Sequence, residues 1–407
     1  MSTTATGMGG LANSTAAAKP VTRSRPALVP WYLWTGVAAV TSASIGGSWD
    51  VAWHRSIGRD TFWTPAHMAI YLCGVLAGIV GMVLVTRATF GRSSGAAQLR
   101  NESVSIFGLH APLGVFLAGW GGVAMLTSAP FDNWWHNAYG LDVKIVSPPH
   151  TLLILGIRAV GIGMLFLILA AMNRAAADAD GGAASFVPLQ RLFLYLGGLM
   201  VVGQMFFLQE YTWDIVLHRN GAYIAMGIGV PVVLALLWQA SRYKWAATVC
   251  SLIYVGYLIA EILIFPLFPA QPKLGPVFTP VTHLIPARFP VLLVFPAFAL
   301  DLLWQRTKSW KPWQIAIVSG ILFIAILAPI EWNFARFLMS HLSDNRFFGS
   351  NYFDYNARPW GYEVQRRFFS PVWGAELAKG LGIATLCAMA STWVGLAFGR
   401  WMKGVQR

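Results

Sequence analysis

Residues 65–86, PAHMAIYLCGVLAGIVGMVLVT, contain no Asp, Glu, Lys or Arg and are long enough to cross a bilayer as one helix. Apolar runs of this kind recur along the chain. Of the 407 residues, 56% are hydrophobic and only 11% are charged, and the mean hydropathy is +0.57. This composition excludes an ordinary water-soluble globule and predicts an all-α integral membrane protein.

The number of membrane crossings can be predicted from apolar runs of about 18 to 25 residues, which give about ten transmembrane helices. They are expected near residues 29–48, 65–86, 104–129, 149–172, 189–209, 221–241, 245–268, 287–304, 313–333 and 373–398. We therefore expect a polytopic membrane domain over residues 29–400.

The remaining segments are polar. Residues 1–28 are rich in Ala, Ser, Thr and Gly and are predicted to be a disordered cytoplasmic tail, and residues 401–407 a basic cytoplasmic tail. Residues 334–372 form the one long polar stretch within the membrane domain, and we expect them to be an external loop.

Basic residues fix the expected orientation. Lys and Arg gather before the first predicted span, in every second loop and at the C-terminal end. Because short cytoplasmic loops retain positive charge, both termini are predicted to be cytoplasmic in a multi-pass protein of the cytoplasmic membrane. The net charge of +13 follows from this topology. The expected partners are the lipid bilayer and further membrane subunits, and no nucleic acid.

One pattern of metal-ligand residues occurs twice beside the predicted spans. The first copy is Asp-x3-His-x12-His and the second Asp-x3-His-x13-His; their residues are Asp50, His54 and His67, then Asp132, His136 and His150. Residues four apart share a helix face, so each Asp and its first His can point at one ion. The second His follows a proline at the start of the next span, and Gly58 and Gly140 are expected to reverse the chain. We therefore predict a duplicated helical hairpin at about 29–86 and 104–172.

Chance does not explain the repetition easily. With eight His and ten Asp in the chain, on the order of 0.2 Asp-x3-His matches are expected at random. Three occur, the third being Asp214 and His218. Two histidines and one carboxylate suit copper, with non-haem iron or zinc as alternatives, and suit calcium or magnesium poorly. The competing interpretations are a hydrogen-bonded turn that holds no ion, and a substrate or proton site.

The first copy also resembles a known motif. Asp50-x3-His54-x12-His67 is similar to the Asp-x3-His-x12-His metal motif of the C subunit of particulate methane and ammonia monooxygenases, which also lies beside transmembrane helices. The resemblance implies a copper site with these three residues as ligands. It covers some 18 residues, and the x13 spacing of the second copy departs from it.

Other ionisable residues gather toward the predicted outer face and form a candidate additional site. They are Glu210, Asp214, His218, Glu261 and His283. Glu261 and Arg158 fall within predicted spans, where charge is costly, so they are candidate partners of each other or of the site. The aromatic residues around both motifs are expected to form an interfacial belt, with the wall of a water-poor pocket as the alternative.

These observations favour a copper-binding membrane oxidoreductase of monooxygenase type that acts on a small or apolar substrate near the outer face. One alternative is a transporter in which paired repeats line a polar path. The other is a non-catalytic subunit that carries metal. Cys73, Cys250 and Cys387 lie far apart within predicted spans, which excludes a thiolate zinc motif.

Overall fold

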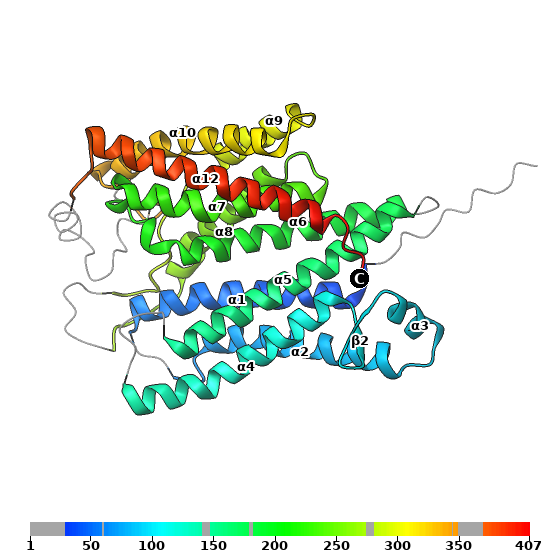
Figure 1. Cartoon of the computed structure of the whole chain (residues 1–407). Helices are drawn as coiled ribbons and strands as arrows, with labels where there is room; N and C mark the ends of the chain where they lie inside the picture. Colours follow the sequence, from blue (N-terminus) through cyan, green and yellow to red (C-terminus); the bar gives the residue numbers. More distant parts are fainter. Residues whose placement is uncertain are drawn as a thin grey trace, which may run out of the picture.

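The structure, a computed structural model, describes residues 29–58, 61–140, 147–178, 182–273, 281–343, 345–348 and 369–407. Long helices dominate it and lie side by side in a bundle (Figure 1). They are α1 (Trp31–Ser56), α2 (Pro65–Phe90), α3 (Ser94–Asn101), α4 (Leu113–Tyr139), α5 (Pro148–Ala177), α6 (Gly182–Phe207), α7 (Asn220–Ser241), α8 (Ala246–Ile264), α9 (Val294–Arg306), α10 (Pro312–Leu338) and α12 (Gly374–Met402).

Short elements connect these helices. Single 3₁₀ turns are formed by η1 (Gln209–Tyr211), η2 (Val216–His218), η3 (Phe265–Leu267) and η4 (His341–Ser343). The described residues contain one small sheet, in which β1 (Val104–Ile106) pairs antiparallel with β2 (Leu109–Ala111).

Eight of the described helices are long and apolar enough to cross a membrane, namely α2, α4, α5, α6, α7, α8 (continued through η3), α10 and α12. The protein is therefore all-α and of the membrane type, with apolar helices suited to contact with lipid.

The structure corrects the boundaries of four predicted segments, in three respects. The run 287–304 is helical only over α9, whose 13 residues span about 20 Å, less than the bilayer core. Pro286 and Pro290 lie just before it, and proline lacks the N–H that a helix interior needs. The run 104–129 starts as the β1–β2 hairpin, because Phe107 and Gly108 adopt positive φ values of 50° and 79° and turn the chain.

The third correction concerns the ends of the polar segments. Helix α10 continues through Leu338, five residues into the predicted external loop 334–372, since Phe334, Phe337 and Leu338 extend its apolar face. Helix α12 likewise ends at Met402, which is buried, rather than before residue 401. Residues 1–28 and 349–368 lie outside the described residues.

The helices that carry the two motifs pack closely. At the α4–α5 crossing, a Cβ added to Gly114 would lie 2.2 Å from the Gly163 carbonyl oxygen, and one added to Gly121 would lie 2.7 Å from that of Gly156. Small residues let helix backbones approach in this way. Ser42 of α1 donates a hydrogen bond to the Ala69 carbonyl of α2 at 2.7 Å. Helices α2 and α4 also pack together, so both hairpins present their connections at the same end of the bundle (Figure 1).

Candidate metal centre

The second motif lies where α4 ends and α5 begins. Asp132 and His136 occupy the last two turns of α4, four residues apart and therefore on one face. His150 is the third residue of α5. Ser147 caps that helix by accepting a hydrogen bond from the His150 backbone N–H at 3.4 Å, and Pro148 takes the first helical position. The cap fixes the point at which α5 starts and so the direction of the His150 side chain.

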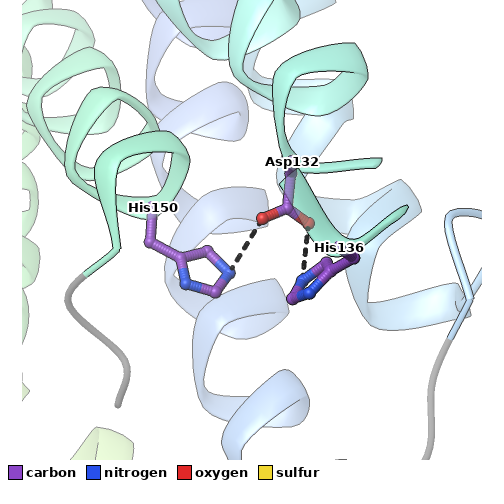
Figure 2. Close-up of side chains that lie close together, drawn as sticks. All are labelled: Asp132, His136 and His150. Carbon is purple, nitrogen blue, oxygen red and sulfur yellow. Dashed lines mark ion pairs between the residues drawn. The ribbon is translucent and has the colours of Figure 1, made fainter. Parts of the chain in front are cut away.

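The three side chains converge (Figure 2). One carboxylate oxygen of Asp132, Oδ2, lies 3.5 Å from Nε2 of His136, and the other, Oδ1, lies 3.6 Å from Nε2 of His150. One ligand atom from each residue can be chosen so that all three lie within 4.8 Å of one another. Among the described residues, this is the one group of three or more His, Cys, Asp or Glu that meets this condition.

A backbone carbonyl sets the orientation of the His136 ring. Nδ1 of His136 lies 3.0 Å from the carbonyl oxygen of Gly140, and this oxygen can only accept, so Nδ1 carries the proton. In the neutral ring, Nε2 then presents a lone pair to Asp132. Gly140 has φ 85° and ψ −174°, a conformation that side-chain-bearing residues avoid. This is the arrangement found around metal-bound histidines, whose second nitrogen donates to a carbonyl or carboxylate.

The first motif repeats this arrangement with differences. Nε2 of His67 lies 3.1 Å from Oδ1 of Asp50, and Nε2 of His54 lies 3.8 Å from Oδ2. His67 is also the third residue of its helix, α2, after Thr64 at the N-cap and Pro65 at the first position. The His54 side chain is 47% exposed, against 27% for His136, whereas His67 is 16% exposed, against 30% for His150.

The distances fit an ion held between the side chains. Ligands bound at 2.0–2.1 Å in a tetrahedral arrangement are separated from each other by about 3.3–3.4 Å. The four carboxylate–imidazole separations are 3.1, 3.5, 3.6 and 3.8 Å, all within about half an ångström of that value. The second motif can therefore take an ion with small side-chain movements, whereas Asp50, His54 and His67 do not form a ligand group of this kind among the described residues.

The hydrogen-bonding state of the carboxylates supports the same fit. Oδ1 of Asp50 and Oδ1 of Asp132 are buried, and each faces Nε2 of a histidine, at 3.1 and 3.6 Å respectively, without a hydrogen bond of normal geometry. A buried carboxylate oxygen whose hydrogen bonding is incomplete is costly. An ion bound between each carboxylate and its histidines would remove that cost.

The two motifs form separate sets of side chains. The described ligand group contains residues of the second motif alone, so the six residues do not close around one ion. Each hairpin supplies its own carboxylate, and each carboxylate faces the histidines of its own hairpin.

The aromatic residues near the motifs do not enclose them. Trp63, Trp134 and Tyr139 are 74%, 54% and 68% exposed, respectively. Trp134 and Tyr139 pack against each other edge to face. Exposed aromatic side chains at the helix ends match an interfacial belt better than the wall of a dry pocket.

The third Asp-x3-His pair is arranged differently. In the segment between α6 and α7, Nδ1 of His218 lies 2.8 Å from the backbone carbonyl oxygen of Asp214, not from its carboxylate. The His218 ring is fully buried against Trp332, and burial lowers its pKa. The Asp214 carboxylate faces Arg288 at 3.8 Å; burial raises its pKa and the guanidinium opposes that shift. This pair is not part of a ligand group.

The other residues of the candidate additional site lie apart. Glu210 is exposed on η1, and Glu261 is buried on α8. His283 pairs with Pro269 in an isolated β-bridge and its Nδ1 lies 2.8 Å from the Thr282 hydroxyl; burial and Arg346 lower its pKa. The described residues give no common ligand group for this set.

Glu261 and Arg158, named above as candidate partners, contact different groups. The Arg158 guanidinium donates to the Met200 carbonyl and to Gln204, and it lies over the Phe207 ring at 4.6 Å. These contacts are all with α6.

Three residues that shape the centres were not identified from the sequence as part of them. Gly140 was expected only to turn the chain, whereas its carbonyl also orients His136. Ser147 and Thr64 were overlooked, although a hydroxyl residue followed directly by proline is a visible helix-start signal in both copies.

Comparison with known protein families, with curated proteins and with solved structures found no match to the chain.

Proposed function

We propose that the protein is a copper-binding membrane protein with two metal centres, Asp50/His54/His67 and Asp132/His136/His150, one on each of two duplicated helical hairpins. The observation that carries the proposal is the Asp132 carboxylate, whose two oxygens each face Nε2 of a histidine from a different helix. Two imidazoles and one carboxylate are a donor set for copper, with non-haem iron and zinc as the alternatives.

The proposed topology places both centres at the outer face of the cytoplasmic membrane, with both termini in the cytoplasm. In this topology α1 adds a ninth crossing to those of the eight apolar helices, since its 26 residues span about 39 Å. A tenth crossing is made by α9 with the non-helical residues 286–293 before it. Val291 and Leu293 in that segment are buried, and non-helical backbone is tolerated at membrane depth where protein covers it.

The proposed activity is oxidation of a small or apolar molecule, and the class is a monooxygenase. Copper bound at such a centre supplies the binding and activation of oxygen. Asp132 provides the anionic ligand, His136 and His150 provide the neutral ones, and Gly140 holds the His136 proton on Nδ1 so that Nε2 remains available.

Metal analysis tests the proposal. The protein, purified in mild detergent, is expected to retain close to two copper ions per chain and to give an electron paramagnetic resonance signal with nitrogen coupling in its Cu(II) form. Asp132→Asn together with Asp50→Asn should remove both ions. His110→Ala is the control, because His110 lies in strand β2, outside either motif. Full metal content in the double variant would show that the two motifs do not bind the metal and have a structural role.

The exposure of the centres favours a second candidate, a subunit that carries metal without catalysing a reaction. The histidines of the second motif are 27% and 30% exposed and His54 is 47% exposed, which leaves the ions open to exchange with a partner. Turnover of a small alkane or ammonia with oxygen and a reductant distinguishes the two candidates. Copper content without turnover, and copper transfer to a membrane partner, would support the carrier.

A further inference from the structure

Glu261 is a buried acid that the metal centres do not use. It lies on α8, one turn before the helix ends, and is only 5% exposed. Both of its carboxylate oxygens are buried; the hydroxyl groups of Ser48 and Tyr257 lie close enough to interact with them, but neither forms a hydrogen bond of normal geometry. An acid at such a position in a membrane helix is expensive, and such groups commonly bind protons, ions or substrates.

A cavity lies next to residues that interact with Glu261. Tyr254 and Leu258 line the cavity and precede Glu261 by seven and three residues, so all three share one face of α8. Ser48 and Arg55 of α1 also line the cavity, and both interact with Glu261. Tyr257 donates a hydrogen bond to Ser48 at 3.1 Å, so a chain of hydroxyl groups runs beside the carboxylate.

The size of the cavity indicates what can fill it. Its volume is about 80 Å³. A buried water needs about 10–15 Å³, so the cavity has room for about five waters. Pockets for organic ligands usually measure about 300–1,000 Å³. Gln209, Thr212 and the two guanidinium groups of Arg55 and Arg288 give such waters polar partners.

The charges around the cavity come from several elements. On α1 the group facing Glu261 is Arg55, and on α8 Tyr254 and Tyr257 lie beside it. The other titratable groups near the cavity are Tyr195 of α6, which interacts with Tyr257; Arg288, paired with Asp214; and Glu331 of α10, which accepts a hydrogen bond from the Leu292 N–H.

We propose that Glu261 is a proton-binding site, and that the cavity between α1, α6, α8 and residues 287–291 is the hydrated path by which it exchanges its proton. The carboxylate takes a proton from a cavity water to become the neutral acid, and it returns the proton to water when it ionises again. The metal centres are separate from this site. Glu261 lies on α8, whereas the residues of the two metal motifs lie on α1, α2, α4 and α5.

Infrared difference spectroscopy on the full chain in lipid nanodiscs tests the proposal. A carbonyl band of a neutral carboxylic acid is expected to decline as the pH is raised, to shift in D₂O, and to be missing in Glu261→Gln. A Glu261 band that changes neither with pH nor with D₂O would refute proton exchange. Metal content is measured in the same samples and is expected to stay at the wild-type value in Glu261→Gln.

A second variant tests the path without removing the acid. Val202 of α6 lines the cavity, and Val202→Phe places a ring in it. The D₂O shift of the Glu261 band is expected to slow at least tenfold, whereas Ile228→Phe, on an exposed face of α7, should leave it unchanged. An exchange rate equal to that of the wild type in Val202→Phe would refute the cavity as the path.

Discussion

Replacing Gly140 with alanine should weaken metal binding at the second centre without touching a ligand. Gly140 adopts φ 85° and ψ −174°. That region is accessible in practice only to glycine, and a side chain held there costs about 1–3 kcal/mol. The backbone of the alanine variant is therefore expected to rotate into an ordinary conformation, which turns the carbonyl group at residue 140 away from His136.

The size of the effect follows from the contact that is lost. The carbonyl oxygen accepts the Nδ1 proton of His136 at 3.0 Å and so directs Nε2 toward Asp132. Loss of such a supporting partner typically lowers metal affinity 10- to 100-fold, which corresponds to about 1.4–2.8 kcal/mol. We expect a decrease in this range for the second centre and no change for the first.

Competition titration with a copper chelator of known affinity measures the change. Gly119→Ala on the same helix is the matched control, since a Cβ there meets no atom within 4 Å. This control should retain wild-type affinity and gain up to about 1 kcal/mol in stability. If Gly140→Ala binds copper as tightly as the wild type, the carbonyl does not orient His136, and the argument for its role fails.

Three further predictions follow from the packing and the two-centre arrangement. His136→Ala should lower the copper content by one ion and leave the first centre filled, as measured by elemental analysis; a loss of both ions would indicate a shared cluster. His218 is buried with a lowered pKa, so the stability it contributes is present above the unfolded-state pKa of about 6.5 and is lost as the pH falls below it. Thermal unfolding between pH 7.5 and 5.5 should therefore show a smaller loss for His218→Gln than for the wild type, and an equal loss would contradict the assignment. Gly114→Ala should destabilise the protein by about 1–3 kcal/mol, because its Cβ would lie 2.2 Å from the Gly163 carbonyl oxygen and force α4 and α5 apart; unchanged unfolding in detergent would show that the crossing can relax.

Local sequence signals predicted the parts of the structure that depend on neighbouring residues. The i/i+4 spacing of Asp132 and His136 and the proline before His150 are short-range features, and the structure brings these residues together. The turns at Gly58 and Gly140 are also confirmed, with φ values of 83° and 85°.

The differences arise where distant residues decide the outcome. Asp214 and His218 have the same spacing as the two motifs, but their segment packs as 3₁₀ turns, and Asp214 faces Arg288 from a segment 74 residues later in the chain. The apolar run 287–304 has the composition of a full transmembrane helix, yet it is helical only from Val294. The non-helical backbone before α9 is tolerated because other parts of the protein bury it. Neither outcome is encoded in a local pattern.

The helix caps in front of His67 and His150 bear on how these centres tolerate changes in chain length. Each histidine is the third residue of its helix, after Thr64 or Ser147 at the N-cap, so the start of the helix sets its direction, and the number of residues before that start has no effect. Ser147 caps α5 through its hydroxyl, whereas Thr64 makes no side-chain cap hydrogen bond. The extra residue of the second copy lies before Ser147 and leaves the ligand in place. An epitope or glycine inserted before Thr64 or Ser147 should likewise preserve the ligand set, whereas a single residue inserted between cap and histidine would rotate the side chain by about 100°. The position of the histidine within its helix, and not its distance along the chain from the first histidine, therefore defines these centres. A search for related proteins by a fixed His–His spacing would miss members that differ only in the length of this connection.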